Sequence, residues 1–201
     1  MEQDKKMVRD FYNEHAHIKA KQFADLRPGG RARDVARAFW LFDKDYPRVV
    51  EIGCGNGREA KLILKHTSNY LGIDLSQTMI ELAKENNPGA NFLVMDAQEF
   101  LFPAEVDIVF SFASLLHCDI AKATAILREA YEALSMNGII YLSLKYGKYE
   151  RVLKSDLLGV TPVYFYTPEL IVQMLDSKMW VIFTEVEALW STKWFTMILQ
   201  K

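Results

Sequence analysis

The spacing of hydrophobic and polar positions divides the chain at about residue 45. Before that point, apolar residues recur at helical intervals and no strand-like run occurs, which predicts helices over about residues 3–24 and 31–42. The breaker Arg27-Pro28-Gly29-Gly30 separates the two. We therefore expect a helical cover at about residues 1–45, followed by a different architecture.

From residue 48 onward, short apolar runs rich in β-branched residues alternate with helical patterns. The runs are apolar nearly throughout, as strands buried on both faces require. This alternation predicts an α/β fold, a doubly wound and mainly parallel sheet with helices on both faces. The predicted strands cover residues 48–52, 70–74, 91–96, 106–111 and 139–144, and the predicted helices cover residues 58–65, 77–85 and 120–134.

Residues with strong cap preferences mark the ends of several helices. Ser76 is expected to cap the second of the three helices above, and Asn137-Gly138 is expected to end the third in a left-handed conformation. Thr167 is expected to cap a further helix that has Pro168 at its first position.

The apolar pattern of the C-terminal part predicts two strands, over residues 180–186 and 194–199, with a turn near Ser191. So short a connection requires an antiparallel pair. A chain of 201 residues is long enough for one well-cored domain and short for two, so residues 1–201 are expected to form a single domain.

Composition narrows the class of protein. The net charge of −2 and the absence of a strong basic patch argue against a nucleic-acid partner. The polar start predicts no signal peptide, and no apolar run is long enough to span a bilayer. Cys54 and Cys118, the only two cysteines, form neither a metal-ligand spacing nor a disulfide framework. These features are typical of a cytoplasmic protein.

The strongest chemical signal is a glycine-rich turn after the first predicted strand. Gly53, Gly55 and Gly57 follow Ile52 directly and precede a helix, an arrangement that lets a ligand approach the backbone at a strand's carboxyl end. A dinucleotide site favours the spacing Gly-x-Gly-x-x-Gly. Here the spacing is Gly-x-Gly-x-Gly, and Glu51 stands two residues ahead. A carboxylate there is unfavourable beside a diphosphate and suits a ligand with an ammonium or sulfonium charge.

Two acids end the next two predicted strands. Asp74 lies 21 residues after Gly53 and can accept hydrogen bonds from both hydroxyls of a ribose. Asp96, followed by Ala97, can accept from an exocyclic amine such as that of adenine. For Asp74 the glycine turn favours ribose binding over a role beside the cap residue Ser76. For Asp96 an exposed loop acid remains a close alternative.

In combination, these motifs resemble the class I S-adenosylmethionine-dependent methyltransferases. The resemblance covers about residues 45–145 and rests on the segments 49–57, 72–76, 95–97, 106–111 and 134–139. It implies a Rossmann-like, seven-stranded sheet whose last strand is antiparallel to the rest, with S-adenosylmethionine as cofactor.

The resemblance also implies roles for individual residues. Glu51 would lie near the methionine end of the cofactor, Asp74 at the ribose and Asp96 with Ala97 at the adenine. Ser111 and Phe112 would border the methionine and the reacting methyl. The implied cofactor site consists of Glu51, Gly53, Cys54, Gly55, Asn56, Gly57, Asp74, Leu75, Asp96, Ala97, Ser111 and Phe112.

The acceptor half of the site resembles the small-molecule subgroup, and in 201 residues we expect no separate target-recognition domain. Ser111-Phe112-Ala113-Ser114 stands where amino-methylating enzymes often carry Asn/Asp-Pro-Pro-aromatic, and no acidic cluster has magnesium-ligand spacing. The cover is expected from the N-terminal helices and from residues 146–166. The candidate substrate contacts are Tyr12, His15, Tyr146, Tyr164 and Tyr166.

Tyr12 and His117 are the candidate catalytic residues. A histidine there can take a proton from the acceptor, although a structural histidine is the competing interpretation. The leading hypothesis is methyl transfer to O, N or S of a small molecule by direct displacement. A methyltransferase acting on protein or RNA, a non-catalytic S-adenosylmethionine-binding protein and a nicotinamide dehydrogenase are the alternatives. The sequence specifies neither the acceptor nor the oligomeric state.

Overall fold

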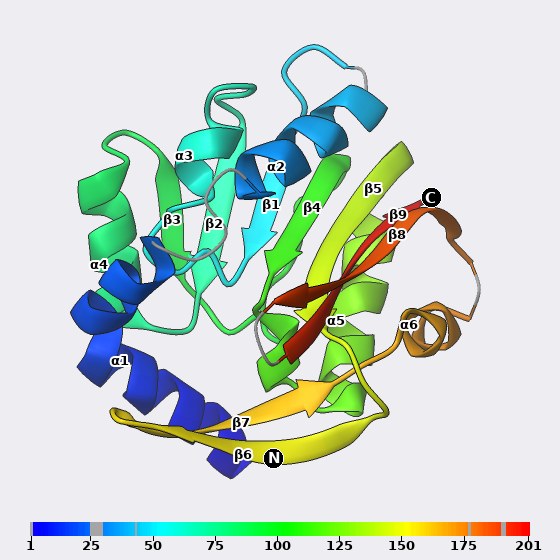
Figure 1. Cartoon of the computed structure of the whole chain (residues 1–201). Helices are drawn as coiled ribbons and strands as arrows, with labels where there is room; N and C mark the ends of the chain where they lie inside the picture. Colours follow the sequence, from blue (N-terminus) through cyan, green and yellow to red (C-terminus); the bar gives the residue numbers. More distant parts are fainter. Residues whose placement is uncertain (1, 25–29, 43, 177, 190–191) are drawn as a thin grey trace.

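The structure, a computed structural model, describes residues 2–24, 30–42, 44–176, 178–189 and 192–201. Seven strands form one sheet in the order β3-β2-β1-β4-β5-β9-β8 (Figure 1). Neighbouring pairs among β1 to β5 are parallel, and β9 runs antiparallel to both β5 and β8. The predicted α/β fold class and the antiparallel last strand are therefore confirmed. The strands are β1 (Val49–Ile52), β2 (Tyr70–Asp74), β3 (Asn91–Val94), β4 (Val106–Phe112), β5 (Leu134–Lys145), β8 (Trp180–Leu189) and β9 (Thr192–Gln200).

Helices cover both faces of the sheet, which explains why its central strands are apolar on both sides (Figure 1). On one face α2 (Gly30–Leu41), α3 (Ala60–Ile63) and α4 (Gln77–Asn86) pack against the sheet through a cluster that includes Phe110 and Tyr141. On the other face α5 (Ile120–Ala133) and α6 (Pro168–Met174) complete a second cluster.

The remaining elements lie across the carboxyl ends of the parallel strands (Figure 1). They are α1 (Glu2–Ala24), the short 3-10 helix η1 (Leu115–His117) and a hairpin of β6 (Glu150–Asp156) and β7 (Gly159–Phe165). Asn13 of α1 accepts a hydrogen bond from the Ser76 hydroxyl at 2.7 Å, and Lys19 pairs with Asp156 of the hairpin at 2.6 Å. These contacts hold α1 over the end of the sheet.

Most predicted elements are present, and both predicted N-caps form. The Ser76 hydroxyl accepts from the backbone N–H of Met79, and the Thr167 hydroxyl accepts from that of Leu170. The helix predicted over residues 58–65 is reduced to Ala60–Ile63. Of the predicted breaker, residues 27–29 lie outside the described residues, as does Ser191 at the predicted C-terminal turn.

In the middle of the chain one prediction was wrong and one pair of strands was missed. The chain leaves α5 at Ala133 and enters β5 directly, so Asn137 adopts its left-handed φ of 64° inside the strand and not as a helix cap. The β6–β7 hairpin was not predicted. Every residue of β6 is exposed, so the alternation that marks a half-buried strand is missing there.

Candidate functional site

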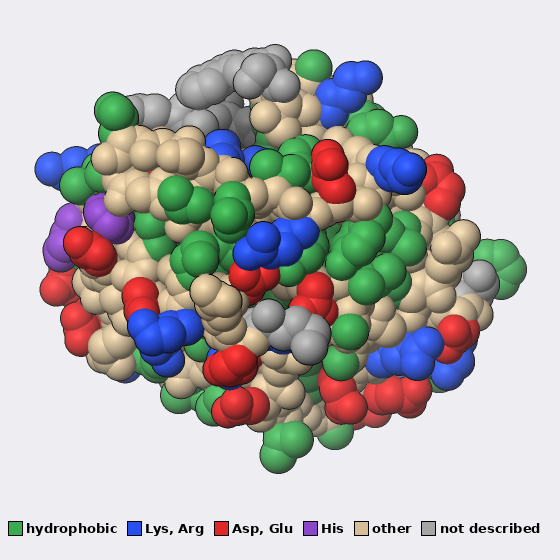
Figure 2. Space-filling view, turned by 90° about the horizontal axis from the view of Figure 1, so that it is seen from below, with side chains coloured by type: hydrophobic (Ala, Val, Ile, Leu, Met, Phe, Trp, Pro, Cys, Tyr) green, Lys and Arg blue, Asp and Glu red, His purple; other side chains and the backbone are tan. Residues whose placement is uncertain are grey.

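A cavity of about 500 Å³ opens at the carboxyl ends of the strands, beneath α1 and the hairpin. Open α/β sheets bind ligands at this edge. Figure 2 views the molecule from this side. On the described surface in that view, acidic, basic and hydrophobic side chains are interspersed, and charge of one sign does not dominate. The glycine turn, the ends of β2, β4 and β5, α1 and the hairpin all contribute to the cavity wall.

The three glycines of the turn have different reasons to be glycine. All three have positive φ, of 68°, 53° and 73°. A Cβ on Gly53 would lie 2.0 Å from Oγ of Ser114, and one on Gly57 would lie 2.5 Å from the Asn87 side chain. A Cβ on Gly55 would meet no atom within 4 Å. Two glycines therefore serve packing, and Gly55 leaves an open cradle at the wall of the cavity.

Asp74 lies beside this cradle and also lines the cavity. Its Oδ2 accepts the backbone N–H of Gly55 at 2.9 Å, and its Oδ1 accepts that of Ser76 at 2.9 Å. Burial raises the pKa of this carboxyl, and the backbone hydrogen bonds oppose that rise. Each carboxylate oxygen keeps a further lone pair, so Asp74 can hold the glycine turn and still accept from a ligand.

Asp96 lines the cavity from the loop after β3. Its Oδ1 accepts the backbone N–H of Gln98, and its Oδ2 forms an ion pair with Lys5 of α1 at 3.0 Å. Asp96 is therefore not the exposed loop acid that the sequence left open as an alternative. Cys54, Asn56, Leu75 and Ala97 line the same cavity, so the structure brings these predicted cofactor residues together.

Glu51 does not line the cavity, which contradicts its predicted position. Side chains alternate along β1, and this one points into the layer of α2 to α4, where the Tyr70 hydroxyl donates to its Oε2 at 2.6 Å. Burial, followed by the nearby carboxylate of Glu59, raises the pKa of Glu51 to about 8. The buried acid is therefore a structural partner of Tyr70.

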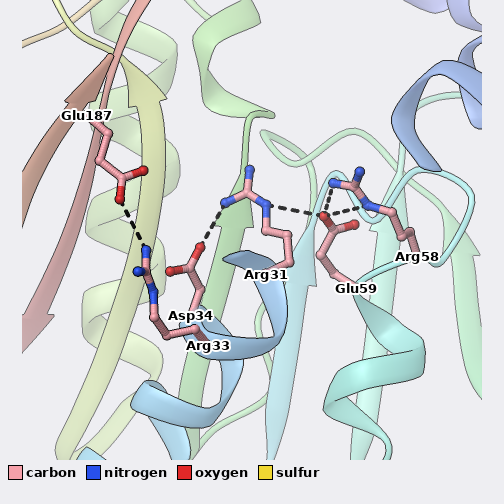
Figure 3. Close-up of polar contacts among 6 residues, drawn as sticks. All are labelled: Arg31, Arg33, Asp34, Arg58, Glu59 and Glu187. Carbon is pink, nitrogen blue, oxygen red and sulfur yellow. Dashed lines mark hydrogen bonds and ion pairs between the residues drawn. The ribbon is translucent and has the colours of Figure 1, made fainter. Parts of the chain in front are cut away.

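An ionic cluster lines the cavity where Glu51 was expected. Arg31 of α2 pairs with Glu59 at 3.4 Å and with Asp34 at 3.4 Å, and Arg58 also contacts Glu59 (Figure 3). The Arg31 guanidinium lies 4.7 Å from the ring centroid of Phe112. Arg31, Arg58 and Glu59 all reach the cavity, which therefore offers both charge signs at this end. Sequence reasoning missed Arg31 because α2 is distant in the chain from the glycine turn, whereas Arg58 and Glu59 directly follow that turn and could have been found from it.

The two residues predicted after the fourth strand separate in the structure. Phe112 lines the cavity, and its ring stacks on that of Phe110 with centroids 5.1 Å apart. Ser111 is fully buried and does not reach the cavity. Neighbouring residues of a strand point to opposite faces, so both could not face one ligand. Gly57 also lies outside the cavity wall, against α4.

The two catalytic candidates meet on the opposite side of the cavity. The Tyr12 hydroxyl of α1 lies 3.2 Å from Nε2 of His117, and both residues line the cavity. Nδ1 of His117 lies 2.8 Å from the carbonyl oxygen of Pro162 in β7. Burial lowers the pKa of His117 to about 4 and raises the pKa of Tyr12 well above its usual range. This pair joins α1, η1 and the hairpin.

The other predicted acceptor contacts lie outside the cavity wall. His15 places Nδ1 3.0 Å from the Phe11 carbonyl oxygen on its own helix. The Tyr164 hydroxyl donates to Asp4, that of Tyr166 donates to the Cys118 carbonyl, and Tyr146 bridges to Tyr166. Among these contacts, the one from Tyr164 to Asp4 joins the hairpin to α1. Residues 146–166 do cover the cavity as expected, but through Lys154, Asp156, Thr161 and Val163.

Three polar residues on the acceptor side were missed. Ser143 and Lys145 come from the end of β5, and Lys154 comes from β6. The signal was present for Lys145, a charged residue that ends an apolar strand in the same way as Asp74 and Asp96. Lys154 lies in the hairpin that the sequence pattern did not reveal.

No group of three or more His, Cys, Asp or Glu side chains among the described residues is placed to hold a metal ion. No described helix has both the length and the apolar character needed to cross a membrane.

Comparison with known proteins supports the resemblance found in the sequence. Residues 49–138 match the model of a family described as a methyltransferase domain. A trans-aconitate 2-methyltransferase of Rhodopseudomonas palustris is 36% identical over 82 residues, which are 40% of this chain and 31% of that protein. A malonyl-[acyl-carrier protein] O-methyltransferase of Ilyobacter polytropus is 28% identical over 143 residues, 69% of this chain and 53% of that protein. The chain thus matches about half or less of the length of these relatives.

The fold extends the comparison to nearly the whole chain. The magnesium protoporphyrin IX methyltransferase of Synechocystis, solved with bound S-adenosylhomocysteine, superposes with a TM-score of 0.74 at 17% identity and covers 98% of this chain and 99% of that one. The 1,6-didemethyltoxoflavin-N1-methyltransferase of Burkholderia thailandensis superposes with a TM-score of 0.74 at 15% identity, over 96% and 87% of the two chains. The Rossmann-like methyltransferase fold predicted from the sequence is confirmed.

Proposed function

We propose that this chain, in which residues 49–138 match the model of a methyltransferase domain and which has a seven-stranded α/β fold, is an S-adenosylmethionine-dependent methyltransferase for a small molecule. One observation carries the proposal. The cradle left open at Gly55 lies beside the Asp74 carboxylate in the wall of a cavity of about 500 Å³. Free thiols at Cys54 and Cys118 are consistent with the further proposal of a cytoplasmic location.

The cavity has polar groups suited to each part of the cofactor. Asp74 would accept the ribose hydroxyls, and the loop of Asp96 and Ala97 would meet the adenine. Arg31 would bind the carboxylate of the methionine part, and Glu59 would bind its ammonium group, because the ionic cluster presents both signs to the cavity. Glu51 takes no part in this scheme.

When bound, S-adenosylmethionine supplies a methyl group made electrophilic by its sulfonium sulfur. The contribution of this chain is to orient the acceptor and to exclude water, and orientation alone accounts for much of the rate in such displacements. Tyr12 and His117 close the acceptor side by linking α1 to the hairpin.

The relatives guide the choice of first acceptors. Two of those reported above are named for transfer to trans-aconitate and to malonyl-[acyl-carrier protein], both of which carry carboxylates. We propose that a small organic acid is the acceptor class to screen first, with release of S-adenosylhomocysteine as the readout.

Calorimetry with S-adenosylmethionine, S-adenosylhomocysteine and NAD tests the cofactor assignment. We expect both adenosyl ligands to bind and NAD not to bind. Asp74→Ala should weaken adenosyl binding at least tenfold, whereas the exposed control Asp45→Ala should leave it unchanged. Binding of NAD without binding of either adenosyl ligand would overturn the proposal.

A further inference from the structure

Five lysines line the cavity, and they differ in their partners. Lys5 pairs with Asp96 and Glu2, and Lys19 pairs with Asp156. Lys122 also has interactions with its surroundings. Lys145 and Lys154, by contrast, form no ion pair with any carboxylate among the described residues.

Lys145 is in an unusual position for an ammonium group. It is only 6% exposed, at the end of β5, with its Nζ 5.7 Å from the ring centroid of Phe165 and 5.8 Å from that of Trp194. Burial and the neighbouring Lys154 ammonium lower the pKa of Lys145 to about 8. A buried cation beside a like charge is costly unless an anion joins it.

A hydroxyl completes this corner of the cavity. Ser143 lies two residues before Lys145 on β5, so both side chains point to the same face of the sheet. Ser143 is fully buried and lines the cavity, and its Oγ has no hydrogen-bond partner among the described residues. Buried hydroxyls are nearly always hydrogen-bonded, so this one is available to a ligand.

The strand order places this corner away from the proposed adenosine contacts and beside the hairpin cover, on the acceptor side of the cavity. The proposed adenosine contacts lie at the ends of β2 and β3, and Arg31 and Glu59 lie at the amino-acid end. Ser143 and Lys145 end β5, on the other side of β4 from the glycine turn, and Lys154 belongs to the hairpin cover. His117 lies close enough for both lysines to lower its pKa further.

We propose that the methyl acceptor carries a carboxylate group, which is bound between the ammonium groups of Lys145 and Lys154 and accepts a hydrogen bond from the Ser143 hydroxyl. The inference rests on the proposed function and specifies its substrate class. The carboxylate would neutralise the paired cations and satisfy the buried hydroxyl in one step. The two ammonium groups and the hydroxyl therefore make the cavity select acidic acceptors over neutral molecules of the same size.

The test uses the full chain saturated with S-adenosylhomocysteine. Malonate, tricarballylate and benzoate are titrated by calorimetry at constant ionic strength, together with malonamide, benzamide and inorganic phosphate. We expect at least one carboxylate to bind the natural protein and the amides not to bind. Lys145→Met and Lys154→Met should each weaken that binding at least tenfold. Lys148→Met, an exposed change of the same charge outside the cavity, should leave it unaltered.

Several outcomes would overturn the inference. One is that none of the three carboxylates binds at millimolar concentration, or that only phosphate binds. Another is that the carboxylate binds Lys145→Met as tightly as it binds the natural protein. A third is that the amides bind as tightly as the acids. Failure of S-adenosylhomocysteine to bind in the first step would instead contradict the proposed function. The two failures are therefore distinguished by separate titrations. Lys154 is exposed, so its variant serves even if Lys145→Met folds poorly.

Discussion

The hydroxyl of Tyr12 donates to Nε2 of His117, because the other ring nitrogen is committed elsewhere. Nδ1 lies 2.8 Å from the Pro162 carbonyl oxygen, which can only accept, so Nδ1 must carry the proton. Nε2 then accepts from Tyr12 across 3.2 Å. The imidazole is thus held neutral with both nitrogens occupied, which makes His117 a positioning residue and not a ready base.

We expect His117 to contribute to the pH dependence of stability and not to that of catalysis near neutrality. Its pKa is lowered to about 4 in the fold, so between pH 4 and 6.5 the unfolded chain binds the extra proton. Stability therefore falls as the pH falls through this window, by at most about 3 kcal/mol. His117→Asn should reduce that fall, as measured by urea unfolding at several pH values. The exposed variant His17→Asn is the control.

A rate measurement separates this positioning role from base catalysis. Once an acceptor is found, His117→Asn should lower methyl transfer less than tenfold, because the loss is one of orientation. The natural enzyme should show no rate inflection that disappears in the variant between pH 5.5 and 7.5. A loss of several hundredfold with unchanged stability would show that His117 acts as the base.

Alanine at Gly53 and at Gly55 should have opposite consequences. Gly53→Ala places a Cβ 2.0 Å from Ser114 Oγ at a φ of 68°, so we expect a loss of at least about 2 kcal/mol in stability. Gly55→Ala meets open space, so only the left-handed conformation costs stability, about 1 kcal/mol. Its Cβ would instead fill the cradle and weaken S-adenosylhomocysteine binding at least tenfold. Thermal unfolding and calorimetry measure the two effects.

The double variant Gly53→Ala/Ser114→Gly is the matched control for the clash. Removing the Ser114 side chain should restore part of the lost stability, while the strain of positive φ remains. No recovery would mean that the conformation alone explains the cost. A Gly55→Ala protein that bound the cofactor normally would exclude the cradle as its site.

The sequence predicted backbone features of the site better than side-chain directions. The glycine turn and Asp74 were found because they depend on local conformation and on the end of a strand, which the hydrophobic pattern reveals. Glu51 and Ser111 were misplaced, since a shift of one residue along a strand moves a side chain to the opposite face. Their true neighbours, Tyr70 and the core under α5, come from other elements.

The acceptor side was least predictable because its residues meet only after folding. Tyr164 and Tyr166 have the size and polarity of substrate contacts, but their hydroxyls bind Asp4 and the Cys118 carbonyl. Aromatic composition does not say which way a ring points. Lys154 lies on a strand with no buried position, so neither its strand nor its approach to Lys145 could be read from the sequence.

The buried charge of Lys145 should reduce the stability of the unliganded protein. Its pKa falls from 10.5 to about 8 on folding, so at pH 7 the folded state bears a penalty of up to about 3 kcal/mol. Lys145→Met should therefore raise the unfolding free energy at pH 7. Between pH 8 and 10.5 the folded lysine loses its proton first, so the natural protein gains stability as the pH rises and the advantage of the variant shrinks.

Charges around Lys145 define the controls for that measurement. Lys154 faces it from the hairpin, His117 lies near it, and the Lys19–Asp156 pair lies on the same cover. Lys148→Met changes the net charge equally without touching this group, and its effect should be small at every pH. If Lys145→Met instead destabilised the protein by more than about 1 kcal/mol, the apolar stem and not the charge would dominate.

Glu51 should tolerate glutamine but not alanine. With its pKa raised to about 8, the buried carboxyl is mostly protonated at pH 7 and still accepts from the Tyr70 hydroxyl. Glu51→Gln keeps an acceptor there, and we expect its unfolding free energy within about 1 kcal/mol of the natural value. Glu51→Ala leaves the Tyr70 hydroxyl unpaired and should cost about 2–4 kcal/mol.

The pH dependence of unfolding tests the protonation of Glu51 directly. Between pH 4.5 and 8 the folded protein retains a proton that the unfolded glutamate has released, so this group makes stability fall as the pH rises. Glu51→Gln has no proton to exchange, so its stability curve should lack that decline. Urea unfolding at pH 5, 6.5 and 8 measures the difference between the two proteins. If glutamine proved as damaging as alanine, the carboxylate would have to be ionised, held by Arg31 and Arg58 across the layer.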